Sequence, residues 1–95
     1  MITHILKCHP LYFKDICRGL KTFEIRKNDR DFKEGDLLTL REYDPTINYF
    51  SGNVLKCRIL YVLHDFEAIK KGYVVLSIFV IKYEPLQNEI PLILA

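Results

Sequence analysis

Five segments of the chain have the residue composition and side-chain alternation of β-strands, and the gaps between most of them are short. These segments span residues 2–8, 21–27, 37–43, 55–63 and 73–81. A parallel strand pair needs a crossover of about a dozen residues or more, usually a helix, and most of the gaps leave no room for one. The pattern therefore predicts an α+β protein that is mainly β: a small closed or nearly closed β-barrel of about five to six strands.

One helix is predicted between the first two strands. Tyr12, Ile16 and Leu20 recur at the four-residue spacing of a single helical face. Gly19 is expected to end this helix in a left-handed conformation. A second, short helical turn is expected in HDFEAIKKG, residues 64–72, before the last long strand.

Size and charge restrict the classes of function. The 95 residues, 49% of them hydrophobic, suit one compact domain. Such a chain buries about two thirds of its unfolded surface, which favours a cleft over a deep catalytic cavity. The net charge of +2 is too small to indicate nucleic-acid binding by itself. The longest apolar stretch, residues 73–81, is far shorter than a membrane span, so a cytoplasmic protein without membrane association is expected.

The cysteines and histidines predict neither disulfides nor a metal site. Cys8, Cys17 and Cys57 are odd in number and have no C-x-x-C spacing, so they are expected to be reduced, buried thiols. Grouped with His4 and His64, they still lack the ligand spacing of a structural zinc site. No metal or other cofactor is expected.

The segment GLKTFEIR, residues 19–26, is the strongest candidate for a functional site. Its alternation places Phe23 and Ile25 on one face of a strand, and Glu24 and Arg26 on the other. Arg26 offers a planar fork of donors for a phosphate or a base edge, and Glu24 offers acceptors for an exocyclic amine. The alternative is a surface ion pair worth about 0–1 kcal/mol. Lys21 could hold a phosphate, act as a base or nucleophile if it is partly desolvated, or simply be exposed.

Further candidates follow this segment. Lys27 and Arg30 belong to a locally basic stretch and are expected to contact phosphate or RNA. Tyr43, with Tyr49 and Phe50, flanks a loop and could stack a base at about 1–3 kcal/mol per base. The alternative for these aromatic residues is that they anchor the loop.

Four residues of the candidate segment have a fixed spacing: Gly19, Lys21, Glu24 and Arg26. This spacing resembles the G-x-K-x-x-E-x-R signature of the ASCH domain, a small barrel of the PUA-like superfamily. The strings KTFEIRKNDRDFKEGD, LREYDP and GYVVLSI also resemble a bacterial and phage subfamily catalogued as a domain of unknown function. The resemblance implies an ASCH/PUA-like domain over residues 1–83, followed by a tail, residues 84–95. It also implies a cleft between helix and barrel that binds RNA or a nucleotide through the signature charges.

An enzymatic alternative comes from the same resemblance. One bacterial ASCH branch hydrolyses the acyl group of an acetylated cytidine, and its lysine is similar in place to Lys21. Glu24 stands where that branch has a threonine, and Glu67 is the acid expected before the last strand. A metal-independent amidohydrolase with Lys21, Glu24 and Glu67 as catalytic residues is thus an alternative, but the absent hydroxyl favours a binding module. A third hypothesis is protein interaction or self-association through the apolar tail, residues 90–94.

Overall fold

A computed structural model of the chain describes residues 1–86, which form a five-stranded sheet and one α-helix. The elements are β1 (Thr3–Cys8), α1 (Pro10–Cys17), β2 (Phe23–Lys27), β3 (Leu37–Asp44), β4 (Tyr49–Leu63) and β5 (Tyr73–Glu84). The mainly β prediction is confirmed, and every predicted strand segment overlaps an observed strand. β4 begins earlier than expected because residues 45–48 form a tight hairpin turn in which Asn48 is left-handed, with φ 50°.

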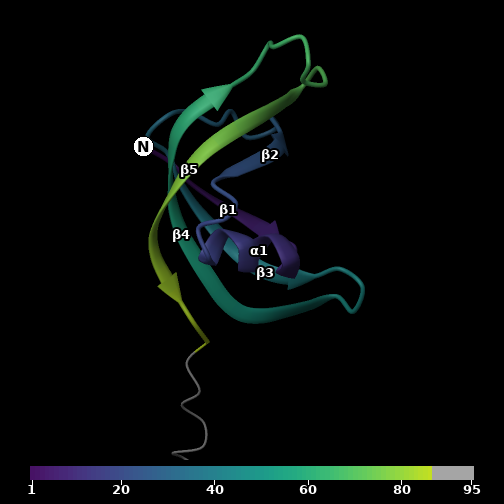
Figure 1. The fold of residues 1–95 in the computed structure, drawn as a ribbon, viewed down its shortest axis with the longest axis vertical. Coiled ribbons are helices and arrows are strands. Elements are labelled where there is room, and N and C mark those ends of the chain that lie inside the picture. The colour runs from purple at the N-terminus through teal and green to yellow at the C-terminus, as the bar shows by residue number, and fades with distance from the viewer. Residues whose placement is uncertain (87–95) are drawn as a thin grey trace, which may run out of the picture.

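The sheet curls into a half-barrel rather than a closed barrel (Figure 1). The strand order is β1-β3-β4-β5-β2, with β1 parallel to β3 and the other pairs antiparallel. Register shifts interrupt the pairing of β4 with β5 at two places and that of β3 with β4 at one, and such bulges bend strands. Within residues 1–86, β1 and β2 are the two edge strands and do not pair with each other. The predicted closed or nearly closed barrel is therefore corrected to a half-barrel.

The core lies on the concave side of this sheet. Its fully enclosed side chains come mainly from the three central strands: Leu38, Leu40, Leu55, Cys57, Ile59, Val74 and Leu76. Cys8 is buried with them, as predicted, but Cys17 is exposed. The prediction for Cys17 fails because this last residue of α1 borders an open groove shared with Leu55 and Tyr83.

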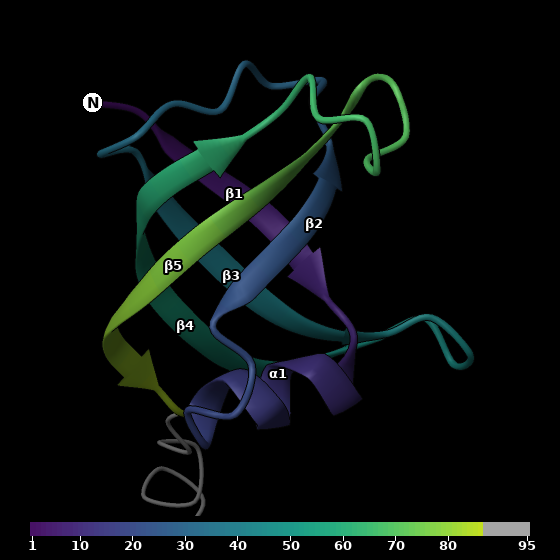
Figure 2. The same cartoon turned by 45° about the horizontal axis from the view of Figure 1, so that its top comes forward.

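The helix α1 lies across the end of the half-barrel at which β2 begins (Figure 2). It connects the two edge strands of the sheet, and Phe13 and Ile16 are its buried residues. The predicted helical face is therefore only partly correct, because Tyr12 is 52% exposed and Leu20, beyond the helix, is 73% exposed. Gly19 follows the helix with φ 75°, which confirms the predicted left-handed residue.

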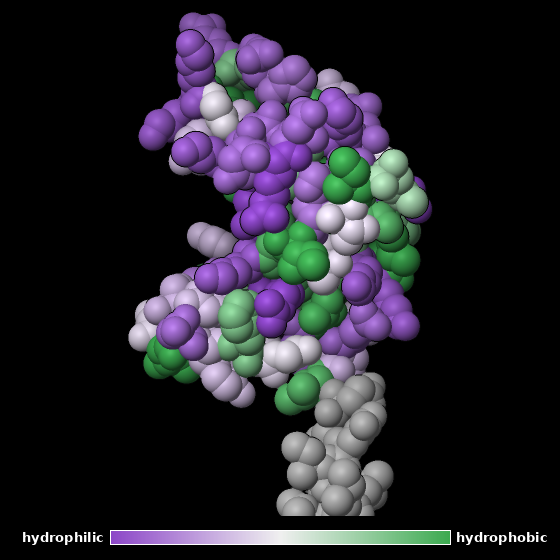
Figure 3. Space-filling view, turned by 180° about the vertical axis from the view of Figure 1, so that it is seen from behind, coloured by the Kyte–Doolittle hydropathy of each residue, from purple (hydrophilic) through white to green (hydrophobic). Residues whose placement is uncertain are grey.

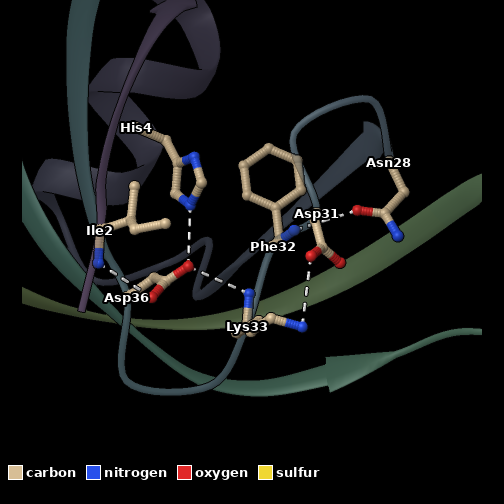
Figure 4. Close-up of polar contacts among 7 residues, drawn as sticks. All are labelled: Ile2, His4, Asn28, Asp31, Phe32, Lys33 and Asp36. Atoms are coloured by element: carbon tan, nitrogen blue, oxygen red, sulfur yellow. Dashed lines mark hydrogen bonds and ion pairs between the residues drawn. The ribbon is translucent and has the colours of Figure 1, made fainter.

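A buried contact between a histidine and an aspartate holds the long connection between β2 and β3 (Figure 4). The His4 ring nitrogen Nε2 lies 2.9 Å from the Asp36 carboxylate, and both side chains are almost fully buried. Asp36 also accepts hydrogen bonds from the backbone N–H groups of Ile2 and Lys33. The His4 ring packs edge-on against Phe32, so this one carboxylate ties β1 to the connection.

The connection between β4 and β5 differs from the predicted helical turn. Residues 64–72 form turns, one of them closed by the Ile69 N–H donating to the carbonyl of Phe66 at 2.9 Å. Within residues 1–86, no helix has the length and apolarity that a membrane crossing requires. Seen from behind, the outline is indented between two lobes, and hydrophobic residues form separate patches among hydrophilic ones (Figure 3).

Candidate functional site

The turn after α1 sets the position of Lys21. Left-handed Gly19 reverses the chain, and the N–H groups of Leu20 and Lys21 both donate to the carbonyl of Asp15, at 2.9 and 3.1 Å. These bonds satisfy a carbonyl that the ending helix leaves without an internal partner. They also fix the start of β2 beside the helix, so Lys21 lies where helix and sheet meet.

Glu24 is buried at the centre of an ionic cluster, with its side chain only 5% exposed. Its Oε1 accepts a hydrogen bond from Lys21 Nζ at 2.7 Å, and its Oε2 accepts one from Arg26 Nε at 2.8 Å. We call these three residues the Lys21–Glu24–Arg26 cluster. The alternative predicted from the sequence, a surface ion pair, is wrong, because the carboxylate is inside the protein and only the two cations reach solvent.

The two cations also hold the backbone around the cluster. Lys21 Nζ donates to the carbonyl of Phe23 at 2.6 Å, and Arg26 Nη2 donates to the carbonyl of Lys7 at 2.8 Å. An ammonium has three donor hydrogens and a guanidinium five. One hydrogen of Lys21 and the Nη1 group of Arg26 therefore form no hydrogen bond within residues 1–86 and remain available to a ligand.

A cleft of about 570 Å³ opens above this cluster. It is lined by Lys7, His9, Tyr12, Lys21 and residues 23–26. The Lys21 ammonium lies 5.2 Å from the centre of the Tyr12 ring and 4.9 Å from that of Phe23. The cleft thus combines aromatic surface with N–H donors and a buried carboxylate.

Cys8 borders the cluster but is poorly suited to act as a nucleophile. Burial, and next the charge of Glu24, raise the pKa of its thiol to about 12. A nucleophilic cysteine needs the opposite environment, since the thiolate is the reactive form.

The other predicted site residues lie in three different places. Arg30 bridges to β1, where its Nη1 donates to the carbonyl of Ile5 at 3.2 Å. Lys27 is exposed at the end of β2 and does not line the cleft. Tyr43 packs on the Phe50 ring, with the centroids 4.6 Å apart.

Glu67 lies away from the cluster. It is exposed in the connection between β4 and β5, which meets the end of β2 opposite to Lys21: Lys27 pairs with Tyr73, and the Asn28 N–H donates to the carbonyl of Gly72. The structure brings Lys21 and Glu24 together but leaves Glu67 outside their site.

Sequence reasoning did not identify several residues of this region. Lys7, His9, Tyr12 and Phe23 line the cleft, yet only the fold brings the end of β1 next to the start of β2. His9 had a local sequence signal, because it directly precedes Pro10, the first residue of α1. In the structure its ring accepts a hydrogen bond from the Leu11 N–H and caps the helix. The other three had no signal that separates them from ordinary exposed residues.

The fold and site define a small mainly β domain, a half-barrel with one helix and a charged, aromatic-walled cleft at their junction. Residues 3–78 match the family model described as Domain of unknown function (DUF3850), and the chain belongs to this family. The predicted kinship with a domain of unknown function is thereby confirmed. The sequence is also similar to the "Uncharacterized 12.9 kDa protein in GpA 3'region" of Escherichia phage P2, with 38% identity over 56 residues. That match covers 59% of this chain and 50% of the phage protein, so the chain spans about half the length of this relative.

Proposed function

We propose that this domain is a PUA-like (ASCH) module that binds RNA or a nucleotide in the cleft above the Lys21–Glu24–Arg26 cluster. The observation that carries the proposal is the buried Glu24, which aims the free donors of Lys21 and Arg26 into a cleft with aromatic walls. Holding two cations around a buried carboxylate is costly for stability compared with apolar packing. A ligand site is a reason to keep such an arrangement.

The chemistry of the cleft suits a nucleobase carrying acceptor groups. Arg26 presents a planar donor group, and such a group pairs well with base carbonyls or phosphate. Tyr12 and Phe23 offer flat apolar faces against which a base can lie. Most of the acceptor capacity of Glu24 is already used within the cluster, so donors rather than acceptors dominate recognition.

One placement supports binding over amide hydrolysis. Glu67, the expected later acid, lies in another part of the fold and does not line the cleft, so it is not positioned to transfer protons there. The proposed interaction through residues 90–94 lies outside the described residues.

Fluorescence anisotropy with a labelled single-stranded RNA tests the proposal. Affinity should fall between about 50 mM and 200 mM salt, because phosphate contacts release counterions. Tyr12→Ala should weaken binding roughly tenfold, which corresponds to the loss of one stacking contact of about 1–3 kcal/mol.

Tyr61→Ala is the matched control, since Tyr61 is 56% exposed on β4 and does not line the cleft. It should leave the affinity unchanged. Absence of binding at low salt, or an equal loss in the two tyrosine variants, would overturn the proposed site.

A further inference from the structure

A second depression adjoins the cleft along the edge of β1. It has a volume of about 420 Å³, and its cationic lining residues are Lys7, Arg26, Arg30 and Arg41. Lys7 and Arg26 line both depressions, so the cleft and this groove are neighbours. We call the second depression the β1 groove.

The four cations reach the β1 groove from different elements. Lys7 and Arg41 are partners in the parallel register of β1 and β3, while Arg26 comes from β2 and Arg30 from the connection after it. Arg26 and Arg30 both donate to carbonyls of β1. The groove therefore lies at the opening of the half-barrel, where β1 has no strand partner on one side.

Two of these cations lack an acidic partner among the residues that the structure describes. Arg26 pairs with Glu24, and Arg30 lies 3.9 Å from Asp29. Lys7 and Arg41 form no ion pair within residues 1–86, although they are neighbours across two strands. Like charges placed side by side repel each other, and an anion between them removes that repulsion.

Aromatic rings hold these two unpaired cations in place. Lys7 Nζ lies 4.4 Å from the centre of the Tyr43 ring, and Arg41 Cζ lies 3.9 Å from that of Phe50. A cation over an aromatic face is oriented without being neutralised. Each of these contacts covers one face of the aromatic ring and leaves the predicted stacking of a base on Tyr43 untested.

We infer that the β1 groove binds the phosphates of a single-stranded nucleic acid whose base enters the cleft, so the ligand is an oligonucleotide rather than a free nucleoside. This inference rests on the proposed function and extends it. Arg26 marks the junction, with contacts to the buried carboxylate on one side and to β1 on the other. Lys7 and Arg41 supply the positive charge that binds the next phosphate of the nucleic acid.

The test uses two labelled probes of equal length, a single-stranded RNA and an abasic sugar-phosphate oligomer. Lys7→Gln and Arg41→Gln remove groove charges, and Arg58→Gln and Lys82→Gln, exposed on β4 and β5, are matched controls that do not line either depression. Each groove variant should reduce the salt slope of RNA binding by about one and weaken it at low salt. The abasic oligomer should bind more weakly than RNA, lose affinity in both groove variants and be insensitive to Tyr12→Ala.

Different results separate the two ideas. If RNA binds in a Tyr12-dependent way but the groove variants lose no more than the controls, the β1 groove is refuted and the cleft stands. If RNA and the abasic oligomer bind equally and Tyr12→Ala changes neither, the groove binds phosphate but the proposed base site is wrong. Failure of both probes to bind at low salt overturns both.

Discussion

Arg26 links the two edge strands of the half-barrel, because its Nη2 on β2 donates a 2.8 Å hydrogen bond to the carbonyl of Lys7 on β1. No backbone ladder joins these strands within residues 1–86. Side chains therefore bridge the opening that a closed barrel would fill with strand pairing. Since the Arg26 side chain also holds Glu24, the same residue supports the fold and presents donors to the cleft.

Removing Arg26 alone should lower the free energy of unfolding more than removing the whole ion pair does. Arg26→Ala leaves the buried Glu24 carboxylate with Lys21 as its sole ionic partner and removes the bridge to β1, so we expect a loss of about 2–4 kcal/mol. The double variant Glu24→Leu, Arg26→Met removes the buried charge as well and should lose less. Urea denaturation measures both free energies of unfolding. A double variant at least as unstable as Arg26→Ala would contradict this view of the cluster.

The strand pattern of β2 shows what the sequence could and could not predict. Its alternation is correct, but the ordinary rule that apolar side chains point inward fails, because Phe23 is 41% and Ile25 58% exposed while Glu24 is buried. The reason is tertiary: the inward face of this edge strand meets Lys21, Arg26 and β1 at the opening of the half-barrel. No local pattern reports such a partner across the sheet.

Strand positions were predictable because alternation and turn residues are local signals. The strand order was not, since β2 pairs with the distant β5 and its other edge stays open. Glu24 and Arg26 were correctly placed on one face, because two-residue spacing on a strand fixes a shared face. Lys21 joins them from the turn before β2, which strand alternation does not predict. The β1 groove was not foreseen, because Lys7 and Arg41 become neighbours only through the parallel pairing of β1 with β3.

The buried Asp36 should make stability depend on pH in the acid range. Burial alone would raise its pKa, but hydrogen bonds from His4 and from the Ile2 and Lys33 N–H groups outweigh it and hold the pKa below the ordinary 3.8. A carboxyl group with a lower pKa in the folded state stabilises the protein above the unfolded pKa, and this contribution is lost as the pH falls through the folded value. The free energy of unfolding should therefore drop below about pH 4.

Asp36→Asn should lower stability at neutral pH and flatten this acid dependence, as measured by urea denaturation across the range. Asp29→Asn is the control, because the Asp29 side chain is 61% exposed and its nearest cation is 3.9 Å away. An unchanged acid dependence in Asp36→Asn would remove Asp36 as its source.

The three thiols should differ in reactivity in the folded protein. Burial raises the pKa of Cys8 and of Cys57 to about 12, and both side chains are enclosed. Cys17 also has a raised pKa through partial burial, but it is exposed and can reach a reagent. A chromogenic disulfide reagent at about pH 8 should modify one thiol per native chain and all three in denaturant. Cys17→Ser should abolish the native reaction; a remaining reactive thiol would show that the core opens.

Substitutions at two adjacent aromatic residues of α1 should separate an effect on stability from an effect on RNA binding. Phe13 is 3% exposed and packs edge-on against Tyr83, whereas Tyr12 faces the cleft and is 52% exposed. Phe13→Ala should lose about 3–5 kcal/mol, the usual cost of deleting a buried aromatic side chain. Tyr12→Ala should change stability by less than about 0.5 kcal/mol, as exposed substitutions do.

Measuring denaturation midpoint and RNA affinity on the same two preparations makes the comparison direct. Tyr12→Leu is a useful third variant, because it keeps apolar bulk on the helix while removing the flat ring. If Tyr12→Leu restores RNA affinity fully, the cleft wall acts through bulk alone and aromatic stacking is excluded. If affinity stays low while the midpoint matches that of the wild type, the Tyr12 ring contributes to ligand binding rather than to the stability of the fold. The four-residue helical spacing had predicted the opposite, a Tyr12 side chain on the packed face of the helix.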